Sequence, residues 1–115
     1  MGAFGGGLGG YGEVCGALAG ALAVIGLRYS RASAGEKENP KMWSDAREMV
    51  RRFRDEIVNQ GGTIACRDIA RVDWTNRDEV RAFYRGERVQ KCIGIVGATA
   101  DVLGELLERD VFTIL

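Results

Sequence analysis

The sequence predicts an all-α protein, a small single-domain bundle of about five helices behind a glycine-rich N-terminal loop. Three observations lead to this prediction. Apolar side chains recur at three- and four-residue steps, helix-start and helix-stop residues separate the periodic segments, and strands do not alternate with helices. The 115 residues are 46% apolar and 28% charged, which suits one domain with a modest core. We therefore expect residues 1–115 to form a single helical domain.

The first predicted elements are a loop and an apolar helix. Met1–Gly12 contains seven glycines and predicts a loop in which backbone segments approach closely. Glu13–Tyr29 predicts a helix that is apolar on all sides, which is typical of a helix in the middle of a fold. Gly16, Gly20 and Ala23 share one face of this helix, so another backbone can pack closely against it.

An amphipathic helix follows a polar connection. Ser30–Asn39 predicts a loop because it is polar and breaks the helical pattern. Asn39 followed by Pro40 is a helix start, with asparagine as the N-cap and proline in the first turn. The pair Gly61-Gly62 is expected to end this helix.

Two short helices are predicted next. Thr63 can cap a helix that runs through Ala70. Thr75 with Asp78 three residues later resembles a capping box, which opens a helix that reaches about Arg85.

The last predicted helix is long, covering Val89–Arg109. The tail DVFTIL, residues 110–115, has a strand-like composition but no obvious partner strand.

Two glycine-containing stretches resemble nucleotide-binding signals, and neither has the required context. GGGLGGYG satisfies G-x-G-x-x-G, but no strand precedes it. CIGIVGATADVLGELLER resembles a strand, a turn and a helix, but too few residues follow for a βαβ unit. We therefore predict no dinucleotide site.

Composition excludes several classes of function. The chain has no histidine, so a Ser-His-Asp or Cys-His nucleophile, a histidine metal ligand and a His-ligated haem cannot form within it, and no haem is expected. Sixteen basic residues balance sixteen acidic ones, so we expect no nucleic-acid partner. The apolar run Val14–Leu27 is about fourteen residues long, short of the roughly 20 that span a bilayer, and no basic residue precedes it. We expect a cytoplasmic protein without membrane insertion.

The three cysteines carry the most specific signal. Cys15 opens the motif CGALAG after an FGGG loop, Cys66 is followed by arginine, and Cys92 follows lysine near the start of the last predicted helix. This order resembles the C-GCAxxG-C-C family of redox-active proteins. The resemblance extends over most of the chain, from about Phe4 to Leu107.

The resemblance implies a small, mainly helical, bacterial-type protein in which Cys15, Cys66 and Cys92 are three of four shared redox cysteines. It also implies a cofactor-binding role for the motif glycines Gly5, Gly6, Gly7, Gly16 and Gly20. Many family members are encoded beside transporter genes, which implies a transporter as a partner. The fourth cysteine should precede the FGGG loop, so we expect either a missing N-terminal helix or a chain that does without that cysteine.

The surroundings of the cysteines suggest how they become reactive. The pKa of a thiol falls from about 8.5 at a helix N-terminus or beside cations. Cys15 lies in the first turn of the first predicted helix, Cys66 adjoins Arg67, and Cys92 adjoins Lys91. We therefore expect each thiol to have a dipole or a cation that favours its thiolate.

Three functions stay open at this point. In the first, an oxidoreductase forms a reversible disulfide, with Cys15 attacking and Cys66 or Cys92 resolving. In the second, the same three cysteines bind an iron–sulfur cluster or a metal for electron transfer, which needs a fourth ligand from elsewhere. In the third, the cysteines are buried apolar residues of a non-catalytic interaction module, for instance a homodimer formed by the Gly/Ala-rich first helix. We rank thiol/disulfide chemistry first.

Overall fold

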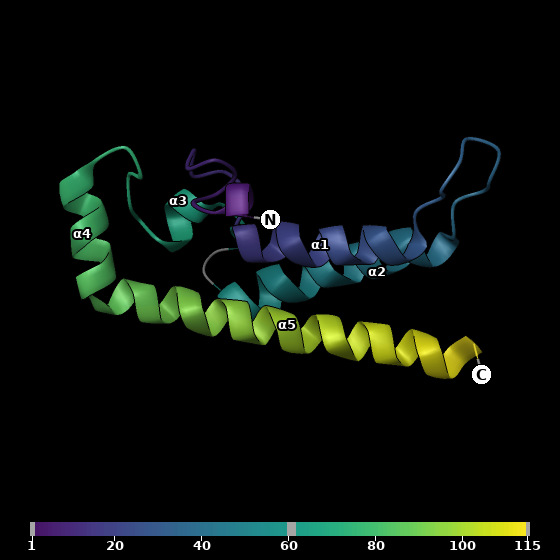
Figure 1. The fold of residues 1–115 in the computed structure, drawn as a ribbon. Helices are drawn as coiled ribbons and strands as arrows, with labels where there is room; N and C mark the ends of the chain where they lie inside the picture. Colours follow the sequence, from purple (N-terminus) through teal and green to yellow (C-terminus); the bar gives the residue numbers. More distant parts are fainter. Residues whose placement is uncertain (1, 60–61, 115) are drawn as a thin grey trace.

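The computed structural model describes the backbone of residues 2–59 and 62–114, and their side chains as far as Arg109. The predicted all-α class is confirmed, and this part of the chain contains no β-strand (Figure 1). The five α-helices are α1 (Gly16–Tyr29), α2 (Pro40–Arg52), α3 (Cys66–Ile69), α4 (Arg77–Arg85) and α5 (Glu87–Ile114). Two short segments have other helical geometries: a 3-10 turn, η1 (Gly2–Phe4), and a π-helical segment, η2 (Phe53–Val58).

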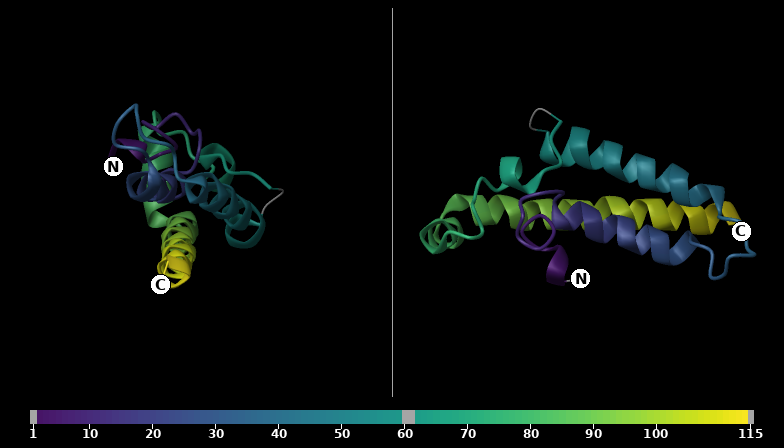
Figure 2. Two further views of the ribbon diagram at one scale, coloured as in Figure 1. Left: turned by 90° about the vertical axis from the view of Figure 1, so that its right-hand side faces the viewer. Right: turned by 90° about the horizontal axis from the view of Figure 1, so that it is seen from above.

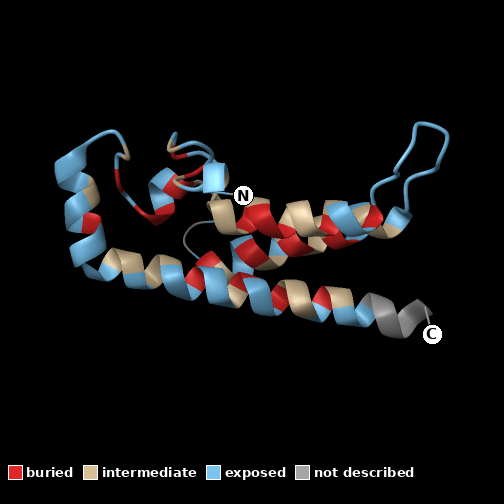
Figure 3. Cartoon of the chain, viewed as in Figure 1, coloured by how far each residue is buried: buried red, intermediate tan, exposed pale blue. Residues whose placement is uncertain are grey.

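The core lies between three helices. α1, α2 and α5 run side by side along a body of 50 × 28 × 21 Å (Figure 2). Buried side chains are concentrated where these helices face one another, as Figure 3 shows. α4 turns away at the start of α5, and together with α3 it encloses a second, smaller apolar cluster. The fold therefore has a bundle end and an end where α3, α4 and the N-terminal loop gather.

α1 begins at Gly16, later than predicted, because the residues before it are extended and form an isolated β-bridge. The helix is not buried on all sides, since Leu27 near its end is 87% exposed. A Cβ added at Gly16 would lie 2.7 Å from the carbonyl oxygen of Phe4. The close approach at this glycine is therefore to the N-terminal loop.

The predicted start of α2 is confirmed, because the side chain of Asn39 accepts a hydrogen bond from the N–H of Lys41 at 2.9 Å. The helix continues through the π-helical segment to Val58. It ends at Asn59, which has a φ of 46°, a left-handed conformation that asparagine tolerates better than most residues. The end comes earlier than predicted, and Gly61 lies outside the described residues.

α3 is slightly shorter than predicted, with Ala70 at its C-cap. Thr63 acts just before it, since its hydroxyl accepts a hydrogen bond from Ala65 N–H at 3.2 Å and donates one to Asp68 at 2.8 Å. The N-cap position itself belongs to Ala65, so the predicted cap at Thr63 is displaced by two residues.

The capping box predicted at the start of α4 is wrong. The side-chain oxygen of Asn76 accepts hydrogen bonds from the N–H groups of Asp78 and Glu79, at 3.0 and 3.2 Å. The hydroxyl of Thr75 instead donates to the Asp73 carboxylate at 2.6 Å. Asparagine is among the strongest N-cap residues, and the hydroxyl of Thr75 is already engaged in its hydrogen bond to Asp73.

α5 begins at Glu87, two residues before the predicted start, and its backbone stays helical through Ile114. The strand-like expectation for the tail is therefore wrong for residues 110–114, and Leu115 lies outside the described residues. A helix pairs its own N–H and C=O groups, whereas a strand without a neighbour leaves them unpaired, so the helix continues. Neither α5 nor any other helix in the described part of the chain is long and apolar enough to cross a membrane.

The cap assignment gives a direct test. Asn76→Ala removes the acceptor of two backbone hydrogen bonds, so we expect it to lower the free energy of unfolding by about 1 kcal/mol. Thr75→Ala leaves that cap in place and should cost less. Urea unfolding of the two variants measures the difference, and a larger loss for Thr75→Ala would contradict the assignment.

Candidate functional site

The N-terminal loop turns in the left-handed sense. Five successive residues, 6–10, have φ between 60° and 77°. Each L-residue in this conformation costs roughly 1–2 kcal/mol, whereas glycine adopts it freely. Four of the five residues are glycines, and Leu8 is the exception. The glycine run therefore specifies a tight turn that most other sequences could not form.

This turn packs closely against Cys66 at the start of α3 and against Trp74. A Cβ added at Gly7 would lie 2.6 Å from both Cys66 Cβ and the backbone nitrogen of Glu13. A Cβ added at Gly6 would lie 3.1 Å from the ring of Trp74. The missing side chains therefore let the loop backbone pack directly on Cys66 and Trp74.

A short antiparallel β-bridge between Val14 and Ala65 joins the segments that precede α1 and α3. The N–H groups of Cys15 and Cys66 complete it, donating to the carbonyls of Ile64 and Glu13 at 2.8 and 2.5 Å. The bridge therefore places Cys15 and Cys66 on adjoining segments. Each cysteine then leads into a helix, Cys15 as the N-cap of α1 and Cys66 as the first residue of α3.

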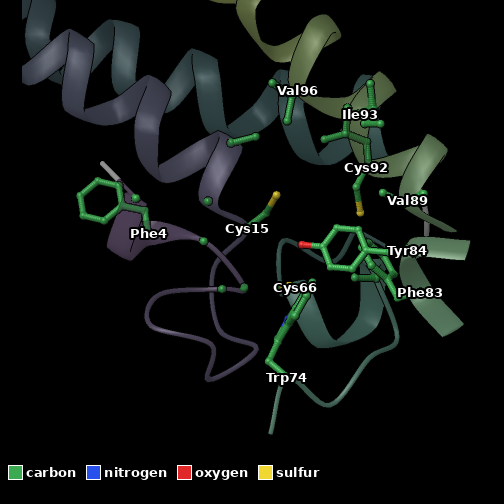
Figure 4. Close-up of a pocket in the computed structure, with 18 residues that line it drawn as sticks. Phe4, Cys15, Cys66, Trp74, Phe83, Tyr84, Val89, Cys92, Ile93 and Val96 are labelled. Carbon is green, nitrogen blue, oxygen red and sulfur yellow. The ribbon is translucent and has the colours of Figure 1, made fainter. Parts of the chain in front are cut away.

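The third cysteine reaches the same place from α5. Cys15, Cys66 and Cys92 all line one pocket of about 500 Å³ (Figure 4). Cys66 is buried, and the other two are partly buried. All three carry free thiols. The structure thus brings together three cysteines that are far apart in the sequence.

Of the five motif glycines, Gly5, Gly6, Gly7 and Gly16 also line this pocket. Gly20 does not line it, because it lies one turn further along α1 and is buried there. The sequence reasoning missed the apolar part of the wall, which includes Phe4, Trp74, Phe83, Tyr84, Ile93 and Val96. The signal that could have found part of it is the pattern of α4, whose aromatic residues are adjacent in a polar helix.

Three aromatic rings close one side of the pocket. The ring centroids of Trp74 and Phe83 are 5.2 Å apart, and those of Phe83 and Tyr84 are 5.3 Å apart, both in edge-to-face geometry. Such pairs add stability beyond their buried area. The indole nitrogen of Trp74 is buried and has no oxygen or nitrogen acceptor among the described residues; it lies beside the sulfur of Cys66.

Burial is the main influence on the pKa values of Cys66 and Cys92. Burial raises the pKa of Cys66 above its ordinary value, the Trp74 indole N–H beside the thiol acts in the opposite direction, and a charge on Cys15 raises it further. Burial also raises the pKa of Cys92, as do charges on Cys15 and Cys66, and Lys91 opposes them. Burial therefore favours the protonated form of Cys66 and Cys92.

Lys91 lowers the pKa of Cys92 as expected, but burial outweighs it and the net pKa is raised, whereas Arg67 does not lower the pKa of Cys66. The guanidinium of Arg67 binds the Glu13 carboxylate at 2.5 Å and the carbonyl of Gly12 at 3.1 Å, so this cation faces away from the thiol beside it. The position of Arg67 next to Cys66 in the sequence did not predict this orientation, because the side chains of adjacent residues at the start of a helix point in different directions.

The thiols do not form a metal centre as they stand. No group of three or more cysteine, aspartate or glutamate side chains in the described part of the chain is placed to hold a metal ion. The arrangement instead offers separate thiols around an apolar space, which suits reactions between two sulfurs at a time.

Comparison with known proteins agrees with the cysteine pattern. The model of a family described as "Putative redox-active protein (C_GCAxxG_C_C)" matches residues 1–106. The chain belongs to this family. The C-GCAxxG-C-C pattern thus accounts for nearly the whole chain, and the FGGG loop and all three cysteines fall inside the match. No curated protein and no solved structure matches the chain.

The packing of the loop predicts that alanine substitution destabilises the fold more at Gly7 than at Gly9. Gly7→Ala combines a strained φ of 71° with a 2.6 Å clash against Cys66, whereas Gly9→Ala has a similar φ of 66° and open space around it. We expect Gly9→Ala to cost about 1 kcal/mol of unfolding free energy and Gly7→Ala to cost at least twice as much. Urea unfolding measures both values, and equal costs would mean that the loop does not press on Cys66.

The pKa shifts predict the pH dependence of alkylation. In the folded protein, Cys66 and Cys92 should react with iodoacetamide with a pH midpoint above that of the unfolded chain. Cys15→Ser removes one repelling charge, so both midpoints should fall while burial keeps them above the unfolded value. Because the folded pKa values are raised, the associated stability is full below the unfolded pKa and is lost as pH rises through the folded pKa.

Peptide mass spectrometry of alkylation at a series of pH values gives the midpoint for each cysteine. Midpoints that stay unchanged in Cys15→Ser would show that Cys15 exerts no charge effect on the other two thiols.

Proposed function

We propose that this chain is a dithiol redox protein, in which Cys15 and a second pocket cysteine form and break a disulfide. The observation that carries the proposal is the shared pocket, since Cys15, Cys66 and Cys92 come from three separate segments and line one cavity. Membership in a family described as redox-active supports the same chemistry.

Cys15 is the attacking thiol in this proposal. Burial raises the pKa of both Cys66 and Cys92, and a negative charge on Cys15 would raise it further, so these two thiols resist ionisation beside it. Its position at the N-cap of α1 places it beside the unpaired N–H groups of the first helical turn, which favour negative charge. Cys15 attacks as the thiolate, and the neighbouring thiol gives up its proton as it resolves.

Each cycle moves two electrons. Oxidation joins the two sulfurs, releases both thiol protons and passes two electrons to an acceptor, and reduction returns them. The resolving thiol is the one that can approach Cys15. Cys66 is fixed at the bridge by its backbone hydrogen bond to Glu13, whereas Cys92 belongs to α5 outside the bridge, and Figure 4 shows the sulfur atoms of Cys15 and Cys92 facing the same space. We therefore propose Cys92 as the resolving cysteine.

The reduced protein should form one internal disulfide when treated with diamide, which takes up both electrons and both protons. We expect the mass to fall by about two hydrogens and two thiols to become unreactive, and dithiothreitol should reverse both changes. Cys15→Ser should lose this oxidation while its circular dichroism stays helical.

Two further variants serve as matched controls. Cys92→Ser should also prevent the internal disulfide, whereas Cys66→Ser should retain it. Reversible oxidation that persists in Cys15→Ser would overturn the role of Cys15, and loss in Cys66→Ser with retention in Cys92→Ser would assign Cys66 as the resolving thiol. Thiols that stay free under diamide in the unaltered protein would overturn the proposed function.

A further inference from the structure

In the described part of the chain, the wall of the cysteine pocket lacks acidic and basic side chains. Not one of the described residues that line it is Asp, Glu, Lys or Arg, although charged residues make up 28% of the sequence. Its mouth is also apolar, since Ile93, Val96 and Tyr84 are 58%, 57% and 62% exposed there. A charged ligand would lose its hydration in this pocket and find no balancing charge on a described lining residue, since Arg88, over an aromatic ring of the wall, and Lys91, beside one of its thiols, do not line it. The pocket therefore favours an uncharged molecule with apolar surface.

One polar group in the described wall lacks an oxygen or nitrogen acceptor. The indole N–H of Trp74 is buried, and among the described atoms its neighbour is the sulfur of Cys66, a weak acceptor. Figure 4 shows the indole nitrogen on the side of Trp74 that faces Cys66. Because sulfur is a weak acceptor, a ligand oxygen that accepts this hydrogen bond would be favoured. The second tryptophan differs, because Trp43 Nε1 donates to Glu38 at 3.0 Å.

The apolar lining, the Trp74 N–H and the thiols together favour an uncharged oxidant that carries a hydrogen-bond acceptor. We propose that the pocket binds an uncharged quinone, with Trp74 donating a hydrogen bond to one carbonyl oxygen and the aromatic residues packing on the ring. The proposal rests on the dithiol function argued above and names the electron acceptor for it. A quinone has the apolar ring that this wall accepts and a carbonyl that the indole N–H can bind.

The reaction balances without any further reactant. Cys15 and the resolving cysteine lose their two thiol protons and two electrons as the S–S bond forms. The quinone gains both protons and both electrons and leaves as the hydroquinone. The same wall discriminates against glutathione and nicotinamide cofactors, because their carboxylates or phosphates would find no cation among the described lining residues.

Binding can be tested separately from electron transfer. Acetophenone is an aromatic ketone that does not oxidise thiols, and 4-acetylbenzoate is its charged analogue. In the reduced protein, acetophenone should shift the indole N–H resonance of Trp74 in a saturable way and leave that of Trp43 in place. 4-Acetylbenzoate should bind at least tenfold more weakly. Equal shifts of both tryptophans, no shift of Trp74, or equal binding of the two ketones would overturn the proposal.

The indole N–H of Trp74 can be removed by a substitution that keeps an aromatic ring at this position. Trp74→Phe should weaken acetophenone binding about 2–10-fold, which is the range of one net hydrogen bond. Trp43→Phe is the matched control and should leave binding unchanged. Binding that is unaffected by Trp74→Phe would remove the indole from the proposed contact.

Electron transfer is then measured with duroquinone, in which every ring position carries a methyl group, so that a thiol cannot add to the ring. Oxidation of the reduced protein should consume two thiols per hydroquinone formed, with a rate that saturates in duroquinone. Charged anthraquinone-2,6-disulfonate should react at least tenfold more slowly at equal driving force, and Trp74→Phe should raise the half-saturating concentration of duroquinone.

The outcomes separate the two proposals. Ketone binding at Trp74 without disulfide formation by any oxidant would overturn the dithiol function while leaving a ligand pocket. Disulfide formation with diamide but without ketone binding or saturation by duroquinone would overturn the quinone proposal alone.

Discussion

The pairing of Val14 with Ala65 is the constraint on which the site depends. It brings together two segments from opposite sides of the α1–α2 hairpin and fixes both with backbone hydrogen bonds. Because each segment then turns into a helix, the bridge also sets where α1 and α3 begin. The left-handed glycine turn packs against the bridge, because Gly7 has no Cβ and its backbone can therefore lie directly on Cys66.

Burial gives the pocket its chemical character. An apolar wall raises the pKa of the Cys66 and Cys92 thiols, and the charges of neighbouring sulfurs add to this effect. Two thiols in such surroundings do not readily carry a negative charge at the same time. The same wall that suppresses extra charge on the protein also discourages charge on a ligand, so thiol reactivity and ligand choice have one physical cause.

Local rules predicted much of the fold. The Asn39-Pro40 start of α2 and the helical periodicity of α5 are visible in the sequence because they depend on neighbouring residues. The bridge between Val14 and Ala65 and the placement of Trp74 are not, since they arise only when distant segments pack. The three cysteines could be named from their motif order. Their common pocket, its aromatic wall and the direction of the pKa shifts needed the packed structure.

The polar connection between α1 and α2 is exposed throughout residues 30–39, and Figure 1 places it at the opposite end of the molecule from the glycine turn and α3. Inserted or replaced residues there would be solvated and would not disturb the bridge that positions the thiols. The chain therefore separates a variable end from a constrained one. A fluorophore or an affinity tag placed in this connection would report on the protein or immobilise it without obstructing the pocket.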